Sequence, residues 1–260
     1  MKNTLILFGI ILITSCFMFA QETNEELTKA AQNPLANIIS IPFQNNTSFN
    51  LPDGRTQNVL NIQPVIPFYN GRLITRTIFP LIWNPDYSQK SGSDFGFGDI
   101  MFTALYSPES KDLNWGIGTI VSLPTGDDTY GSGKWSVGPS LVALLMPGQW
   151  VLGGLINNVW SVAGDENRSD VNFMTFQPFL NYNFPDFYLI FSPVITANWK
   201  ADRDDQWTVP LGIGAGKLIR FGKLPVNINA SYYNNLVKPD NYADWTLRIQ
   251  AAILLPASIL

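Results

Sequence analysis

Few side chains in this chain of 260 residues are suited to covalent or metal chemistry, because it contains no histidine and a single cysteine, Cys16. Catalytic triads that need histidine, zinc sites built on histidine and disulfide frameworks are therefore excluded. Serine and threonine hydroxyls are frequent, but a nucleophile would need Asp, Glu or Lys as its base. No spacing in the sequence singles out such a set, so we expect neither enzyme activity nor a cofactor.

Two acidic clusters are the remaining candidates for a metal site. Asp127 and Asp128 lie in a glycine-rich segment, and Asp202, Asp204 and Asp205 lie in a second loop segment. Carboxylate oxygens are ligands that Ca²⁺ prefers, but neither segment has the full ligand pattern of a calcium loop. We therefore interpret both as solvated turns and predict no metal site. The net charge of −4 argues against a nucleic-acid partner, which would require a basic surface.

Polar side chains recur at every second position within otherwise apolar segments, for example over residues 225–234 and 244–255. This period places them on one face of a β-strand. A charge such as Arg76 on a lipid-facing surface would cost about 2–4 kcal/mol near mid-membrane, so we expect the polar face to point inward. The candidate interior residues are then Gln44, Asn46, Asn61, Gln63, Arg76, Asp99, Asn157, Gln177, Asn229 and Arg248.

Twelve segments of this kind can be identified, and each is long enough for a tilted strand to cross a bilayer. No stretch after residue 20 is an unbroken apolar run of about 18 residues, as a transmembrane helix would need. We predict a transmembrane antiparallel β-barrel of about twelve strands, in an all-β fold with a short N-terminal helix. The strands are expected at 38–50, 57–69, 72–84, 95–107, 113–124, 134–146, 150–162, 171–183, 187–199, 206–220, 225–234 and 244–255.

Alternation alone would also suit a soluble sandwich, but the connections favour a barrel. Short links such as 70–71 and 147–148 alternate with longer acidic ones such as 86–94 and 164–170. Short periplasmic turns opposite long external loops are typical of outer-membrane barrels. Prolines within the strands, such as Pro64 and Pro193, lack a ladder donor and are expected at bulges or bends.

The aromatic residues also favour a barrel, because they gather where strands end. Amphipathic rings prefer the membrane interfaces, so two belts are predicted. The belt at the long-loop end comprises Trp83, Trp135, Trp160, Trp199, Trp207 and Trp245, and the belt at the short-turn end comprises Trp115, Trp150, Tyr69, Tyr106, Tyr182 and Tyr188.

The first twenty residues have the charge and apolar run of an export signal. Cleavage after Ala20 is favoured, and lipidation at Cys16 is the alternative. Residues 23–33 are predicted to form a short helix that Pro34 ends. The chain is thus divided into a signal peptide (1–20), an N-terminal helical segment (21–37) and an outer-membrane barrel (38–256).

A barrel of twelve strands is intermediate between small filled barrels and open porins. Its polar interior residues could bond to one another and fill the lumen, or they could guide a solute. Arg76 and Asp99 lie on adjacent predicted strands, so an internal ion pair is expected. The helix over 23–33 is too short to be stable alone, and we predict that it caps or partly plugs the periplasmic mouth.

Several short motifs are distinctive as a set: NPLANIISIPFQNN (33–46), NIQPVIP (61–67), GDI (98–100), LPT (123–125), GKW (133–135), WSVAG (160–164) and QPFL (177–180). Together they resemble a bacterial family labelled "putative MetA-pathway of phenol degradation", whose members are often called transporters. The resemblance extends from about Leu27 to Pro256 and implies an outer-membrane barrel, although this chain ends on Ile259-Leu260 where many barrels end on an aromatic residue.

These observations together predict a channel-like protein of the cell outer membrane that passes or binds a small solute, hydrophobic or aromatic solutes included. The alternative is a non-transporting barrel that is structural or binds a ligand or partner. Outer-membrane lipid and a small solute are the expected partners, without nucleic acid.

Overall fold

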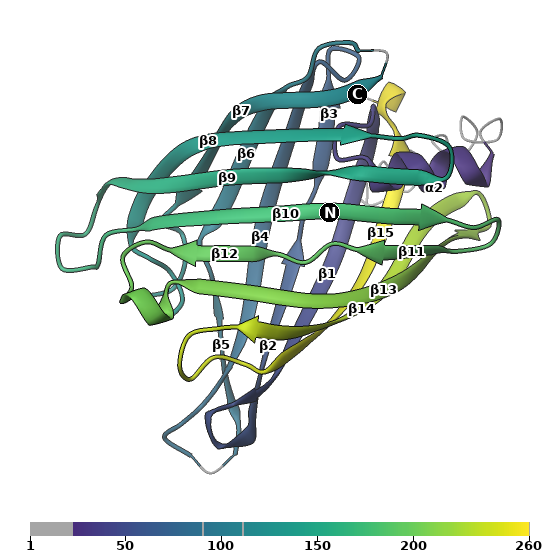
Figure 1. Cartoon of the computed structure of the whole chain (residues 1–260). Helices are drawn as coiled ribbons and strands as arrows, with labels where there is room; N and C mark the ends of the chain where they lie inside the picture. Colours follow the sequence, from purple (N-terminus) through teal and green to yellow (C-terminus); the bar gives the residue numbers. More distant parts are fainter. Residues whose placement is uncertain (1–22, 90, 111, 260) are drawn as a thin grey trace, which may run out of the picture.

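The computed structural model describes residues 23–89, 91–110 and 112–259, and these form one closed antiparallel β-barrel (Figure 1). Pairing of β9 with β10 and of β15 with β1 closes the ring. The predicted signal peptide, its cleavage after Ala20 and the alternative at Cys16 lie outside the described residues. No described helix is long and apolar enough to cross a membrane.

The sheet consists of fifteen segments, which make twelve barrel strands because three strands are each interrupted once. The interrupted strands are β2 with β3, β5 with β6, and β11 with β12. The predicted strand number is confirmed, and the predicted boundaries agree to within about three residues. The segments are β1 (Ile38–Leu51), β2 (Arg55–Ile62), β3 (Val65–Phe68), β4 (Leu73–Pro85), β5 (Ser93–Phe97), β6 (Ile100–Tyr106), β7 (Leu113–Leu123), β8 (Lys134–Leu145), β9 (Trp150–Gly164), β10 (Asn172–Asn183), β11 (Tyr188–Phe191), β12 (Ile195–Asn198), β13 (Trp207–Phe221), β14 (Leu224–Val237) and β15 (Trp245–Pro256).

Within the described residues, four helical segments accompany the strands: α2 (Asn24–Gln32) and the 3-10 turns η2 (Pro52–Gly54), η3 (Arg203–Asp205) and η4 (Ala257–Ile259). Helix α2 begins where the sequence predicts, because Thr23 and Glu26 form a reciprocal capping box. It ends one residue before Asn33, ahead of Pro34.

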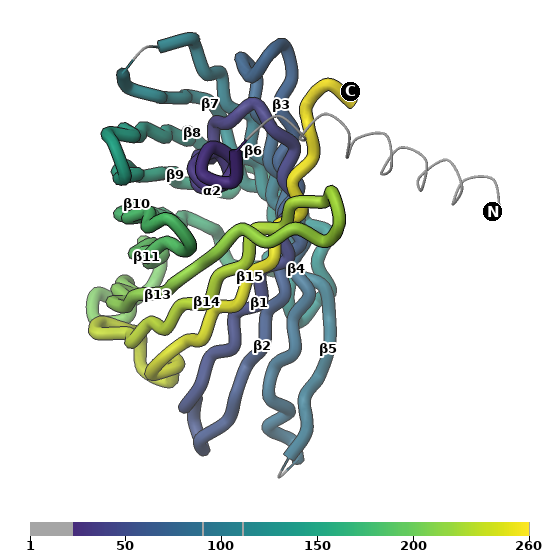
Figure 2. The backbone as a smooth tube through the Cα atoms, turned by 90° about the vertical axis from the view of Figure 1, so that its right-hand side faces the viewer, coloured from purple at the N-terminus to yellow at the C-terminus, as the bar shows by residue number. Residues whose placement is uncertain are grey.

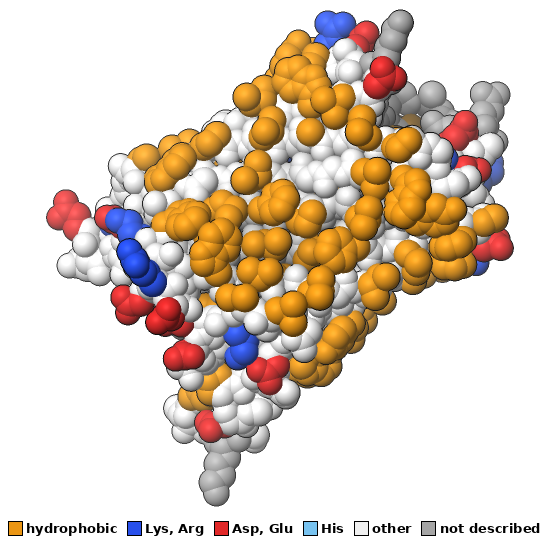
Figure 3. Space-filling view, in the orientation of Figure 1, with side chains coloured by type: hydrophobic (Ala, Val, Ile, Leu, Met, Phe, Trp, Pro, Cys, Tyr) orange, Lys and Arg blue, Asp and Glu red, His pale blue; other side chains and the backbone are white. Residues whose placement is uncertain are grey.

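Burial in the strands is inverted relative to a soluble protein. In β14, Asn227 is 2% exposed whereas its neighbour Ile228 is 37% exposed, and the alternation continues along the strand. Buried polar and exposed apolar side chains suit a barrel whose outer surface contacts lipid. Figure 3 shows hydrophobic side chains across the middle of one face and charged side chains near its ends.

The in-strand prolines lie where pairing is irregular, as predicted. Pro64 and Pro193 occupy the breaks between β2 and β3 and between β11 and β12. The register of β13 against β14 shifts between Val209 and Pro210. A proline cannot donate to the ladder, so a local break or shift removes the need for that donor.

The aromatic residues predicted for the two belts lie near the ends of the strands, and many of them, Trp135, Trp150 and Trp160 included, are exposed. At the long-loop end, Trp199 and Trp207 pack edge to face with their ring centroids 5.4 Å apart. At the short-turn end, Trp150 packs against Tyr182 at 4.7 Å. Tyr188 was placed in this belt by its position near a strand end, and this assignment is wrong, because the residue is 0% exposed and faces the interior.

Candidate functional site

The barrel encloses a cavity of about 370 Å³, lined by strands from around the barrel and by the N-terminal segment. Eight of the ten predicted interior residues line it: Gln44, Asn61, Gln63, Arg76, Asn157, Gln177, Asn229 and Arg248. Asn46 lies behind Arg248 and accepts a hydrogen bond from its Nε at 2.9 Å. Nine of the ten residues thus lie at the cavity or bond directly to a residue that lines it, whereas Asp99 is not among the lining residues.

Asp99 does not form the predicted ion pair with Arg76. Its carboxylate accepts hydrogen bonds from the backbone N–H groups of Gly126 (3.0 Å) and Ser132 (2.7 Å) and from the Ser132 hydroxyl. Arg76 pairs in register with Thr103, four residues nearer the short-turn end than Asp99. Adjacent strands thus bring the two residues to different depths, and the sequence expectation of an ion pair is wrong.

Arg248 is held by neutral partners. Besides Asn46, its Nη1 donates to the carbonyl of Ser192 at 3.1 Å, and its guanidinium lies 4.9 Å from the ring centroid of Tyr233. The Tyr233 hydroxyl donates to the same Ser192 carbonyl at 3.2 Å, and Gln177 Nε2 donates to the Ser192 hydroxyl at 2.7 Å. Ser192 thus links three interior side chains.

Sequence reasoning missed Ser192, and the signal that could have identified it is the following proline. Pro193 breaks the strand between β11 and β12, so the Ser192 carbonyl is free to accept from side chains instead of from a ladder partner.

Glycines in β13 let the interior side chains pack tightly. A Cβ at Gly216 would lie 2.2 Å from the ring of Tyr188, so the ring occupies the space that a side chain would take. The Tyr188 hydroxyl then reaches Asn227 and donates to its Oδ1 at 3.1 Å. This packing explains why Tyr188 points inward and not toward the membrane.

The long loops are tied together at their end of the barrel. Arg168 donates to the backbone carbonyls of Asp128 (2.7 Å), Ser132 (3.4 Å) and Gly131. The Tyr130 ring packs against Gly96, and burial raises the pKa of its hydroxyl to about 12.

In the two acidic clusters that were considered for calcium, aspartate side chains accept hydrogen bonds from backbone N–H groups of the loops and strands around them. The Asp127 carboxylate accepts from the N–H of Phe97 at 2.7 Å, and Asp205 accepts from the N–H of Asp240 at 2.8 Å. Among the described residues, no group of three or more acidic or cysteine side chains is arranged to hold a metal ion.

Replacing Arg168 by alanine is expected to open the loop at 124–133. Three backbone carbonyls lose a charged donor in this variant. If the free energy that holds the loop closed falls by about 1.4 kcal/mol, the loop opens about tenfold more often. Chymotrypsin should then cleave the folded protein after Tyr130 about tenfold faster. Arg203→Ala is the matched control, since the exposed Arg203 makes no hydrogen bond in the described structure. Equal cleavage of the two variants would show that Arg168 does not hold the loop.

The N-terminal segment lies inside the short-turn end of the barrel, where Figure 2 shows α2 nearly end-on. Leu27 of α2 is 0% exposed and packs with Leu218, Ala252 and Leu254. Gln32 Nε2 donates to Asn183 Oδ1 of the barrel wall at 2.7 Å. The predicted position of this segment at the mouth is therefore confirmed.

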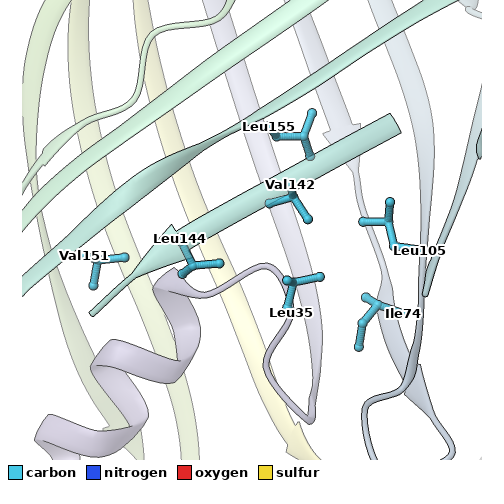
Figure 4. Close-up of a cluster of buried hydrophobic side chains, with 7 residues drawn as sticks. All are labelled: Leu35, Ile74, Leu105, Val142, Leu144, Val151 and Leu155. Carbon is cyan, nitrogen blue, oxygen red and sulfur yellow. The ribbon is translucent and has the colours of Figure 1, made fainter. Parts of the chain in front are cut away.

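Leu35, just beyond α2, is the second anchor of the segment. Its side chain packs among Val142 and Leu144 of β8 and Ile74 and Leu105 of β4 and β6, strands that lie on one side of the barrel (Figure 4). Residues 30–34 and Ala36 border the cavity, so this segment forms its floor. Leu35 anchors the segment at β4, β6 and β8, whereas Leu27 anchors it at β13 and β15, so the segment between them crosses the path through the barrel.

Comparison with known proteins agrees with this architecture. The COG4313 outer membrane channel from Pseudomonas putida F1 superposes with a TM-score of 0.59 and 16% identity, over 84% of this chain and 94% of that chain. The NanC porin superposes with a TM-score of 0.55 and 10% identity, over 83% of this chain and 98% of that chain. At such low identity the likeness shows the shared barrel fold alone.

The comparison with curated proteins found no match. A family model, in contrast, matches residues 41–236, from the first barrel strand to the end of β14. Because this match covers well over half of the sequence, the protein belongs to the family described as "Putative MetA-pathway of phenol degradation".

Proposed function

We propose that the protein is a channel of the outer membrane through which a small solute passes, and that it has no catalytic activity of its own. The observation that carries this proposal is a cavity of about 370 Å³, bordered by arginine and amide side chains as well as apolar ones, inside a closed barrel with an apolar outer surface. Polar groups in the interior lower the barrier that lipid presents to a polar solute. The description of the family supports a small aromatic compound as one class of solute.

Export to the outer membrane is part of the same proposal. The first twenty residues carry the signal, cleavage follows Ala20, and the barrel then inserts with both belts of aromatic residues at the lipid–water interfaces. The long loops lie outside the cell, and the N-terminal segment lies on the periplasmic side. Sequencing the N-terminus of the protein recovered from the outer membrane tests the cleavage position, with Gln21 as the expected first residue.

The N-terminal segment favours one alternative function. Because the segment from Leu27 to Leu35 crosses the interior and residues 30–34 form the floor of the cavity, a segment that never moves would leave a barrel that binds a ligand without passing it. Transport therefore requires this segment to shift or leave the mouth.

Solute flux into liposomes distinguishes the two functions. The purified mature protein should admit small neutral sugars and small organic acids, whereas protein-free liposomes should not. A variant that fills the cavity, Asn229→Trp, should lower the flux several-fold, because Asn229 faces the interior. The matched control is Ile228→Trp on the same strand, whose side chain faces outward and should leave the flux unchanged.

Folding of each variant is checked by its heat-modifiable migration on gels. A native barrel that admits no ion or small organic solute in any condition would contradict transport and support the ligand-binding alternative.

A further inference from the structure

The cavity is unusual in its charge. Among the described residues that line it, two are cationic, Arg76 and Arg248, and none is Asp or Glu. The whole chain carries a net charge of −4. The positive interior therefore does not follow from overall composition, but from where the fold places its charged side chains.

Neither guanidinium is neutralised by the protein. Arg76 donates to the amide oxygen of Gln63, and Arg248 donates to Asn46 and to the carbonyl of Ser192. None of the ion pairs among the described residues involves either arginine. A guanidinium has five N–H donors in a planar fork, so these bonds leave donors on both side chains available to a solute.

The two arginines line one cavity, and like charges that share a buried cavity repel each other. In the barrel, β15 and β4 are separated only by β1 and β2, and both side chains line the same cavity. Two cations without a counterion are costly inside a protein. An anion between them would remove the repulsion and add charged hydrogen bonds.

The remaining lining indicates what kind of anion fits. On β4, Arg76 is followed two residues later by Ile78, which also lines the cavity, and Met101 pairs with Ile78 across the sheet. Phe179 lines the cavity as well. The anionic group would therefore contact arginine and amides while an apolar body contacts these side chains, and a cavity of about 370 Å³ lies within the range of small-ligand sites.

We propose that the cavity binds small organic carboxylates with an apolar or aromatic body, the carboxylate held between Arg76 and Arg248, and that the open channel selects anions over cations. This inference rests on the proposed function and names the solute class for the same cavity. Fork-shaped guanidinium groups match the two oxygens of a carboxylate, so planar carboxylates are favoured over neutral molecules of the same shape.

Binding is tested with the full mature protein folded in detergent, by isothermal titration with benzoate and with benzyl alcohol, which is similar in size but neutral. Benzoate should bind at least about tenfold more tightly, as the loss of one charged hydrogen bond implies. The double variant Arg76→Gln, Arg248→Gln should abolish this preference. Arg72→Gln is the control, because Arg72 lies in the turn before β4 and pairs with Glu109 outside the cavity. Equal binding of the two compounds by the wild-type protein would overturn the proposal, even if the double variant did not fold.

Selectivity is tested in planar bilayers by the reversal potential under a potassium chloride gradient. The wild-type channel should prefer chloride, and the double glutamine variant should lose that preference while Arg72→Gln retains it. Conduction without anion preference would contradict the inference and leave the channel function intact. Preferential benzoate binding by a barrel that never conducts would contradict the channel function and leave the anion site intact.

Discussion

Replacing Leu27 and Leu35 together by alanine is expected to raise the single-channel conductance several-fold. Leu27 and Leu35 are 0% and 7% exposed, and a buried leucine replaced by alanine typically costs about 2–5 kcal/mol. The helix they anchor, α2, has nine residues and cannot remain stable when detached. The segment should therefore unfold and leave the mouth, while the strand ladders keep the barrel closed.

The measurement is conductance in planar bilayers, with heat-modifiable migration as the check that the barrel is folded. Leu211→Ala, Leu236→Ala is the matched control, because these leucines are 51% and 62% exposed on the outer face. A deletion that stops at residue 33 would leave Leu35 in place, so its effect should be smaller than that of a deletion through Ala36.

A reversible cross-link that holds the segment in place is expected to lower the conductance, if movement of the segment opens the channel. Cysteines in place of Gln32 and Asn183, whose side chains are hydrogen bonded, can be joined by a short thiol-reactive reagent. The cross-linked channel should conduct little, and reduction of the link should restore its activity. Unchanged conductance in the double alanine variant, together with protease cleavage of the segment in the native barrel, would show that it does not control passage.

Replacing Gly138 by alanine is expected to prevent most of the protein molecules from folding into a barrel. A Cβ at this position would lie 1.7 Å from the carbonyl oxygen of Asn158 and 2.7 Å from its carbon. Both atoms belong to the backbone of β9, so no rotation of a side chain can relieve the clash. Strands β8 and β9 would have to separate next to Pro139, at a cost above the typical 1–3 kcal/mol of overpacking.

Gly154→Ala on β9 is the matched control for this substitution. The nearest atom to a Cβ at Gly154 would belong to the ring of Phe176, at 3.1 Å, and this ring can move. The yield of heat-modifiable barrel and the urea midpoint should fall sharply for Gly138→Ala and little for Gly154→Ala. Similar midpoints for the two variants would mean that β8 and β9 can shift enough to admit a side chain.

Much of the fold could be predicted because its determinants are local. The two-residue period of a segment such as 225–234 reports which side chains share a face, and the turn residues mark where each strand ends. Lipid on one side and water on the other then decide which face is apolar, and Asn227 and Ile228 follow this rule. Burial was harder to predict for Tyr188, because a tyrosine near a strand end suits an interface belt or an interior equally well.

The sequence by itself determined the twelve strands, the polar inner face, the capped helix after Thr23 and the absence of histidine chemistry, because each depends on residue types and short-range periodicity. Only the tertiary structure decided which inner residues meet. Neighbouring tilted strands are staggered along the barrel, so Asp99 joins the outer loops, while Arg76 lines the cavity together with Arg248 and forms no ion pair among the described residues. Likewise, the segment from Leu27 to Leu35 becomes a plug only because the closed ring places β13 and β15, which hold Leu27, on a different side of the barrel from β4, β6 and β8, which hold Leu35. Contacts of this kind join residues far apart in the chain, and no local pattern encodes their depth in the barrel.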